Sequence, residues 1–265
     1  MKEPKIAILD GDIIAYRVAF WAETEGIDEI PYRVYQDIQE WTPGNIDEII
    51  VAMSCPRENN FRRDFWPLYK KHRDASRIPD ALLYTIETIY ETSDRDNIQV
   101  RCVDRLEADD LIGMMVSAGK AVGITIDKDL KQIPGWHMNP DKDGIPHYIS
   151  EEEADAFFYE QWMAGDSTDN IWGLWRVGPK KARKILKEVE KKEWDGTIME
   201  AYASEDWDKR PENRIPDMSK EEYALAQARC VRILRHGDYN KKTKEISLWS
   251  PDNLVYSKSN NNIED

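Results

Sequence analysis

The chain has 265 residues, of which 41% are hydrophobic, so it can bury a substantial core and does not have the composition of a disordered protein. It carries 51 acidic and 37 basic side chains, and the net charge of −14 disfavours a polyanionic partner unless the acids gather in one pocket where cations neutralise them. The three cysteines lack zinc-binding spacing and no stretch approaches eighteen consecutive apolar residues, which argues against a zinc site and a transmembrane helix and favours a cytoplasmic protein.

The first half of the chain alternates between two kinds of segment. Short apolar runs predict strands at 5–9, 48–53, 98–103 and 121–126, and helical spacing predicts helices at 32–41, 79–92 and 108–118. A hairpin is expected at 136–149, with Asp143-Gly144 at its turn. This alternation predicts an α/β fold with a central, mostly parallel sheet and flanking helices.

From Ser150 onward the pattern is helical. Helices are predicted at 151–164, 179–192 and 219–234. The last fifteen residues, 251–265, have little that can pack, so we expect a mobile tail.

Acidic residues follow three of the predicted strands. They are Asp10 after the first strand, Glu107, Asp109 and Asp110 after the third, and Asp127 and Asp129 after the fourth. Because the carboxyl ends of parallel strands meet at one edge of a sheet, these acids should converge there. Asp166 and Asp169, three residues apart, can add a further pair. Taken singly, each acid could equally be a helix cap.

So many carboxylates can share a crevice only if cations lie among them. Oxygen ligands without histidine or cysteine favour Mg²⁺ or Mn²⁺ over zinc. Two such ions can activate a water molecule and stabilise the leaving oxygen in phosphoryl transfer. The four histidines show no ligand spacing and are read as structural or surface residues.

Four segments, LDGD, RLEADDLIG, TIDKDLKQIPG and GDSTDNIWGLWRVGPKKA, together resemble the five-prime nuclease superfamily. It includes the flap endonucleases, the amino-terminal nuclease of bacterial DNA polymerase I and phage five-prime to three-prime exonucleases. The resemblance runs from about residue 5 to about residue 190, and the size is most like that of a phage-encoded exonuclease. It implies a PIN-like catalytic region at 1–160 with a helical arch at about 56–95, and a helix-three-turn-helix (H3TH) DNA-binding region at 161–250.

The resemblance also implies two metal sites. Asp10, Glu107, Asp109 and Asp110 would surround one ion, and Asp127, Asp129, Asp166 and Asp169 the other. In the H3TH region, Gly173 and Gly178 would let the backbone approach DNA, and the helix after Pro179 would offer its amino-terminal NH groups to phosphate. Lys180, Lys181, Arg183 and Lys184 add positive charge there, or form a solvated helix face.

The segment FRRDFWPLYKKHR, residues 61–73, is similar to the arch of that family. The similarity implies that Lys70 acts on the scissile phosphate together with Arg73, and that Arg62, Arg63 and Lys71 contact DNA. Arg17, on the first helix, is a further candidate for phosphate contact. Phe65, Trp66 and Tyr69 either stack on bases or pack the arch against the body.

The chain departs from the family pattern at two positions. Met53-Ser54-Cys55 stands where the family has an acid after the second strand, which removes one ligand from the first metal site. Arg176 replaces a usual glycine of the hairpin, which bears on a backbone contact with phosphate or a potassium ion.

These features predict a monomeric, metal-dependent nuclease that cleaves DNA at duplex ends or five-prime flaps and has replication proteins as candidate partners. Two alternatives remain open. A PIN-type ribonuclease would share the sheet and the acids but generally lacks the glycine-rich hairpin, and a branched-DNA-binding protein without catalysis would follow from a weakened first metal site.

Overall fold

The computed structural model describes residues 4–142, 144–211 and 215–251. The chain divides into two compact units: unit 1 is residues 1–61, 75–154 and 233–244, and unit 2 is residues 62–74, 155–232 and 245–265. Each unit has its own hydrophobic core. No helix among the described residues is long and apolar enough to cross a membrane.

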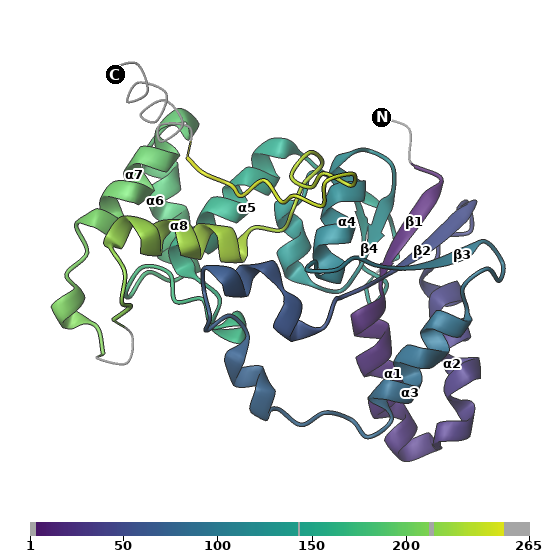
Figure 1. The fold of residues 1–265 in the computed structure, drawn as a ribbon. Helices are drawn as coiled ribbons and strands as arrows, with labels where there is room; N and C mark the ends of the chain where they lie inside the picture. Colours follow the sequence, from purple (N-terminus) through teal and green to yellow (C-terminus); the bar gives the residue numbers. More distant parts are fainter. Residues whose placement is uncertain (1–3, 143, 212–214, 252–265) are drawn as a thin grey trace. The chain divides into compact units, whose positions relative to one another are not determined.

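Unit 1 is built on a six-stranded sheet in the order β3-β2-β1-β4-β5-β6 (Figure 1). All pairs are parallel except β5 and β6, which form the predicted hairpin. The strands are β1 Ile6–Asp10, β2 Glu48–Met53, β3 Ile98–Cys102, β4 Val122–Ile124, β5 Gly135–Met138 and β6 His147–Ile149. The predicted mostly parallel sheet is confirmed, while Asp143 of the predicted turn lies outside the described residues.

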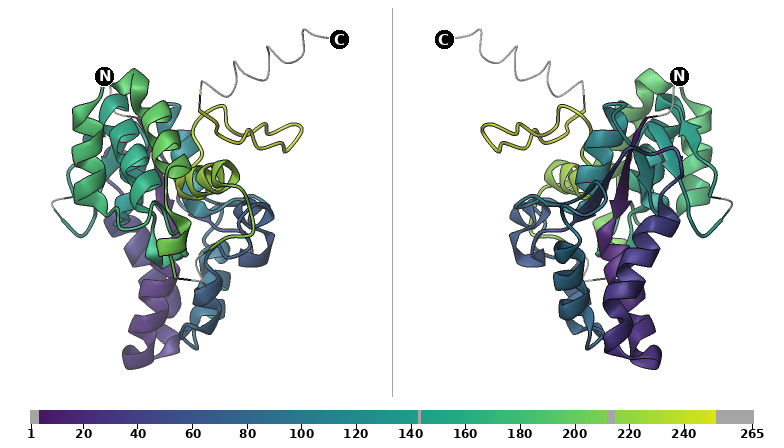
Figure 2. Two further views of the ribbon diagram at one scale, coloured as in Figure 1. Left: turned by 90° about the vertical axis from the view of Figure 1, so that its left-hand side faces the viewer. Right: turned by 90° about the vertical axis from the view of Figure 1, so that its right-hand side faces the viewer.

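Helices cover both faces of this sheet. One face packs against α1 Gly11–Glu25, α2 Ile30–Trp41 and α3 Leu82–Glu91, and the other against α4 Ala108–Ser117. Because side chains alternate along a strand, Ala7 and Leu9 of β1 join the core on the first side while the fully buried Ile8 points to the other. Figure 2 shows α1 and α2 lying side by side.

The junction of β1 and α1 requires a glycine. A Cβ atom on Gly11 would lie 2.3 Å from Met53 Sδ and 2.7 Å from the carbonyl oxygen of Ala52. The preceding residue, Asp10, caps α1 by accepting a hydrogen bond from Ile13 N at 3.2 Å. The last residue of β1 is therefore held close to the end of β2.

Unit 2 is helical, with an aromatic core. Its helices are α5 Glu151–Ala164, which joins unit 2 from Asp155 onward, α6 Pro179–Glu188, α7 Trp194–Ala203 and α8 Lys220–Val231. The core contains Phe158, Trp162, Tyr202 and Tyr223, and also Trp66 from the segment 62–74. Aromatic side chains bury large areas, so a small helical unit gains much of its stability from them.

The part of the expected arch that precedes α3 is not α-helical. Between β2 and α3 the chain forms only 3-10 turns, at Arg57–Asn59, Phe61–Asp64 and Lys71–Ala75. Pro67 lies in the middle of this stretch, and proline removes a backbone donor that a helix interior needs. Residues 62–74 instead pack into unit 2, where Trp66 and Tyr69 are each 2% exposed. Of the two roles considered for these aromatic side chains, packing and base stacking, their burial supports packing.

Candidate active site

The acids that follow the parallel strands of unit 1 lie at one edge of its sheet. Asp10 ends β1, Glu107 precedes α4 after β3, and Asp127 follows β4. The parallel order of β3, β2, β1 and β4 brings these strand ends together, as the sequence predicts. We refer to Asp10, Asp12, Glu107, Asp109, Asp127 and Asp129 as the acid edge.

Asp10 is the most deeply buried member of the acid edge, at 3% exposure. Burial, followed by the negative charges of Asp12 and Asp127, raises its pKa to about 7. Hydrogen bonds from Ile13 N and from Thr125 Oγ1, the latter at 3.1 Å, partly offset this rise. A cation bound near this carboxyl group would stabilise its ionised form and lower its pKa.

Thr125 connects Asp10 with Asp127. Its hydroxyl donates to Asp10 Oδ2 and accepts from Asp127 N at 3.0 Å. Asp127 Oδ1 in turn accepts from Asp129 N at 2.8 Å, which starts the 3-10 turn Lys128–Gln132. Thr125 carries no signal in the sequence that singles it out, because its partners Asp10 and Asp127 are 115 and two residues away.

Asp12 is a second residue that the sequence analysis overlooked, although it stands in the LDGD segment. Its Oδ1 accepts a hydrogen bond from Ser54 N at 3.2 Å, so its carboxylate lies at the end of β2. Ser54 belongs to the stretch Met53-Ser54-Cys55, which lacks an acid of its own. Asp12 thus supplies an acidic group beside this strand end.

Asp110 has a different place from the one predicted. It is fully buried, and its two oxygens accept from the backbone nitrogens of Glu107 and Leu234, each at 3.1 Å. Both oxygens are therefore engaged by backbone donors inside the fold. The structure indicates that Asp110 anchors the segment after α8 to α4, and its role as a metal ligand stays a prediction. Glu107 and Asp109 are half-buried.

The donor set of the acid edge suits a hard divalent cation, because it consists of carboxylate oxygens. Within the described ranges, no three His, Cys, Asp or Glu side chains are arranged closely enough to hold a metal ion. The like charges that raise the pKa of Asp10 nevertheless place Asp12 and Asp127 within electrostatic range of Asp10. The residues fit a cation by their chemistry and charge.

Asp166 and Asp169 belong to unit 2. Asp166 Oδ1 accepts from Thr168 N at 2.7 Å and from Thr168 Oγ1 at 2.6 Å. Asp169 Oδ1 pairs with Arg73 Nη2 at 2.5 Å, and Asp169 Oδ2 lies 3.6 Å from Lys70 Nζ. The structure therefore brings one predicted metal ligand together with both basic residues that the family resemblance assigns to the scissile phosphate.

The backbone reinforces this contact. Lys70 N donates to the Asp169 carbonyl at 2.9 Å, and Arg73 Nε donates to the Thr168 carbonyl at 3.0 Å. Lys70 has a φ of +52°, in the left-handed region that a lysine seldom adopts. The segment 62–74 is thus fastened to the loop that carries Asp166 and Asp169.

The other basic residues predicted to contact DNA differ in how far their side chains are exposed. Arg62 is buried, and its guanidinium donates to the carbonyls of Cys230 and Arg232, so its contact with DNA stays a prediction. Arg63 is half-buried and Lys71 is exposed. Arg17 pairs with Asp141 at 2.7 Å and lies over the Trp41 ring. A phosphate would have to compete with that carboxylate.

The glycine-rich stretch 165–178 joins α5 to α6. Gly178 is the exposed N-cap of α6, Pro179 is its first residue, and Lys180 and Lys181 are exposed on its first turn, as the sequence predicts. Gly173 is buried instead, and both of its backbone polar groups are bound by side chains of unit 2. A direct contact between Gly173 and DNA stays a prediction.

Residues 5–139 match the family model described as the 5'-3' exonuclease, N-terminal resolvase-like domain. The exonuclease of Escherichia phage T7 is 29% identical over 76% of this chain and 74% of its own length. DNA polymerase I of Rhizobium leguminosarum is 33% identical, over 48% of this chain, and the match spans 14% of that longer protein. Among solved structures, the bacteriophage T5 D15 flap endonuclease, in complex with DNA and metal ions, has a TM-score of 0.58 and 17% identity, covering 85% of each chain.

Proposed function

This chain belongs to the 5'-3' exonuclease family, and on that premise we propose that it is a divalent-metal-dependent nuclease that hydrolyses DNA from five-prime ends or at five-prime flaps. The T7 relative is an exonuclease, and this chain matches three quarters of its length. The T5 neighbour, which shares the fold, is a flap endonuclease that has been crystallised with DNA and metal ions. Both activities are compatible with one acidic site.

The observation that carries this proposal is the buried carboxyl group of Asp10 among like charges. Asp12 and Asp127 both raise its pKa, and Thr125 fixes the distance between Asp10 and the Asp127 backbone. Buried carboxyl groups so close to like charges destabilise the folded protein unless a bound cation or substrate offsets the repulsion. Its place at the carboxyl edge of a parallel sheet is the usual place for a ligand in α/β folds.

We propose that Asp10, Asp12, Glu107, Asp109, Asp127 and Asp129 hold the divalent ions, Mg²⁺ or Mn²⁺ by their oxygen donors. Bound there, two ions would supply an activated water and neutralise charge on the phosphate. Asp166 and Asp169 are proposed to assist as the family resemblance implies. For Asp169 this requires release from Arg73 and Lys70. A potassium ion at the hairpin is a further proposal, with Arg176 at the position usually held by glycine.

Lys70 and Arg73 are proposed to stabilise the negative charge that develops on the scissile phosphate. Gly178, Lys180 and Lys181 at the start of α6 are proposed to bind the DNA backbone, since exposed NH groups of a helix amino terminus favour phosphate. Arg63, Lys71 and Arg17 are secondary candidates. We further propose a phage origin, a monomeric enzyme, a location in the host cytoplasm and a role in DNA replication.

The test is cleavage of end-labelled duplex and five-prime-flap DNA with Mg²⁺, with and without a chelator, and with RNA of the same sequence as a parallel substrate. We expect DNA cleavage that the chelator abolishes. Asp127→Asn should lose cleavage and retain DNA binding, whereas Asp28→Asn, an exposed acid away from the acid edge, should cleave like the wild type. Faster cleavage of RNA would favour a PIN-type ribonuclease. Binding of branched DNA without metal-stimulated turnover would favour a non-catalytic binding protein.

A further inference from the structure

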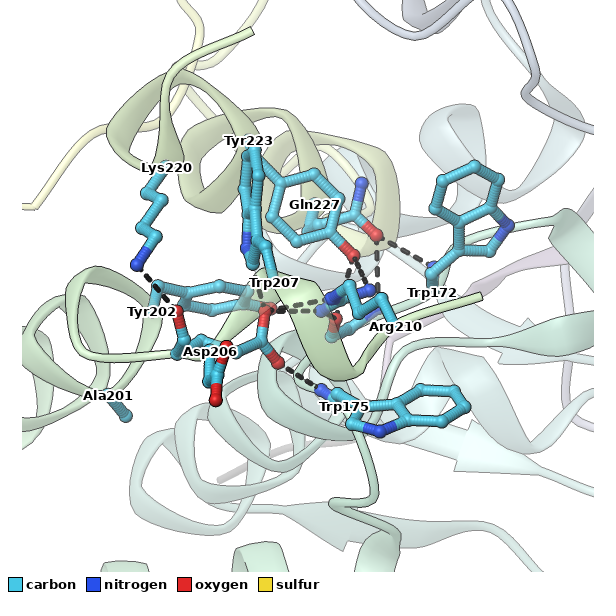
Figure 3. Close-up of polar contacts among 12 residues, drawn as sticks. Trp172, Trp175, Ala201, Tyr202, Asp206, Trp207, Arg210, Lys220, Tyr223 and Gln227 are labelled. Atoms are coloured by element: carbon cyan, nitrogen blue, oxygen red, sulfur yellow. Dashed lines mark hydrogen bonds and ion pairs between the residues drawn. The ribbon is translucent and has the colours of Figure 1, made fainter. Parts of the chain in front are cut away.

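A buried polar network in unit 2 holds the stretch 172–175 from within. It is formed by the side chains of Glu205, Arg210, Tyr223 and Gln227. Figure 3 shows Arg210, Tyr223 and Gln227 beside Trp172. We call this group the internal anchor. The family model matches residues 5–139, so the internal anchor lies in a part of the chain that this match does not cover.

The internal anchor satisfies both backbone polar groups of Gly173. Gln227 Oε1 accepts from Trp172 N at 2.7 Å and from Gly173 N at 3.0 Å. The Gly173 carbonyl accepts from the Tyr223 hydroxyl at 2.7 Å and from Arg210 Nη2 at 2.8 Å. Buried backbone groups need such partners, and here side chains supply them in place of regular secondary structure.

Glu205 forms an ion pair with Arg210 and also binds the backbone at Trp175. Its Oε2 accepts from Arg210 Nη2 at 2.6 Å and from Trp207 Nε1 at 3.0 Å, and its Oε1 accepts from Trp175 N. The Arg210 side chain has no exposed surface, and that of Glu205 is 9% exposed. A buried ion pair adds little net stability compared with apolar packing, but it can fix one conformation among several.

The backbone at Gly173 leaves little freedom for another arrangement. Its φ is +58°, and a Cβ atom there would lie 2.5 Å from Gly165 N and 2.6 Å from the Met163 carbonyl oxygen. Trp175 is only three residues before Gly178, the N-cap of α6. The conformation of 172–175 therefore sets where the chain enters α6.

We propose that Glu205, Arg210, Tyr223 and Gln227 are positioning residues for DNA binding, which hold 172–175 so that the amino terminus of α6 faces a phosphate. This inference rests on the proposed function, because it assigns a purpose to the surface of α6 as a DNA contact. These four side chains act through the stretch 172–175 and do not themselves touch DNA, since they are buried.

The test compares Tyr223→Phe and Arg210→Lys with the matched control Tyr202→Phe. Tyr202 is also buried in unit 2 and donates its hydroxyl to the Trp162 carbonyl at 2.5 Å, outside the stretch 172–175. Hydrogen exchange reports the protection of the Gly173 and Trp175 amides. The Kd for a five-prime-flap DNA is measured in chelator at several salt concentrations, and circular dichroism with thermal melting checks the fold.

We expect Tyr223→Phe and Arg210→Lys to lower the protection of the Gly173 and Trp175 amides. We also expect them to raise the Kd by about fivefold or more, with a salt slope shallower by about one, because a phosphate contact at α6 is lost. Tyr202→Phe and Tyr223→Phe should both have a lower melting temperature than the wild type. Tyr202→Phe should nevertheless keep the wild-type Kd and salt slope. A merely structural role would lower melting temperatures without changing the salt slope.

Unchanged amide protection in Tyr223→Phe would overturn the proposal, as would reduced protection with a wild-type Kd and salt slope. If Arg210→Lys does not fold, Tyr223→Phe alone decides, since it removes a single hydroxyl group. Wild-type protein that binds no flap DNA would overturn the proposed function and this inference with it. Wild-type binding with unaffected variants would overturn the inference alone.

Discussion

Asp10 gives the acid edge a dependence on pH that can be measured without a substrate. Its folded-state pKa is about 7, against an ordinary value of 3.8, chiefly because it is buried. Between these values the folded protein keeps a proton that the unfolded chain releases, so the free energy of unfolding falls as pH rises through this window. In chelator, we expect wild-type stability to fall by about 2–4 kcal/mol between pH 4 and pH 8 relative to Asp10→Asn.

Urea denaturation of the two proteins at both pH values measures this difference. Asp28→Asn serves as the control, because Asp28 is exposed, and it should follow the wild type across the whole range. Parallel curves for the wild type and Asp10→Asn would show that Asp10 titrates near its ordinary value. Mg²⁺ should raise the stability of the wild type more at pH 8 than at pH 5, since ions favour the charged carboxylate.

Arg73 provides a second test at the scale of single residues. It pairs with Asp169, and in the proposed reaction its guanidinium would pair with the scissile phosphate instead. Arg73→Gln should lower the single-turnover cleavage rate at saturating DNA about 10²-fold, as expected when one charged stabiliser of a transition state is lost. Lys192→Gln is the control, because Lys192 is exposed and pairs with Glu190 at the surface. Equal rates for Arg73→Gln and wild type would remove Arg73 from the reaction.

At the scale of elements, α1 begins at Gly11, where the backbone lies so close to β2 that there is no room for a side chain. A methyl group on Gly11 would meet the Ala52 carbonyl oxygen at 2.7 Å, and a backbone atom cannot rotate away. We expect Gly11→Ala to lower the free energy of unfolding by about 1–3 kcal/mol, the usual effect of overpacking. Gly44→Ala, at an exposed glycine with nothing within 4 Å, should change it by less than about 0.5 kcal/mol. Equal denaturation midpoints for the two variants would contradict the close approach.

The sequence predicted elements best where the local pattern is continuous. The strand at Glu48–Met53 and the helix at Glu151–Ala164 have the predicted bounds. An uninterrupted apolar run suits a strand buried on both faces, and β2 is such a strand because it lies between β1 and β3. Helix α7, Trp194–Ala203, was not predicted, since it is short and has Gly196 near its start.

Features that depend on distant partners were beyond the reach of local patterns. Arg62 reads as a surface base in its sequence context, but its carbonyl acceptors, Cys230 and Arg232, are about 170 residues away. The hydrogen bond from Leu234 N to Asp110 was likewise not predictable from the local acidic motif, because the two residues are 124 apart in the sequence. The convergence of Asp10 and Asp127 was predictable, because it follows from parallel strand order alone.

At the scale of the whole molecule, the chain returns to unit 1 after α8. Residues 233–244 belong to unit 1, where Ile233 N donates to Gln132 Oε1 at 2.9 Å and Arg235 donates to the Gln132 carbonyl at 2.7 Å. Unit 1 is therefore assembled from three stretches of sequence. Both compact units draw on residues from each half of the chain.

The net charge of −14 sets a condition on DNA binding by the whole molecule. An acidic protein is repelled by DNA on average, so binding must come from a local basic surface, and α6 presents exposed Lys180 and Lys181. Replacing both lysines by glutamine should weaken flap-DNA binding and make the slope of log Kd against log salt shallower by about two. The matched control replaces Lys241 and Lys242, which are exposed in unit 1. Both double variants remove two positive charges, so net charge alone would affect them equally. Equal salt slopes in the two double variants would show that α6 is not the DNA-binding surface.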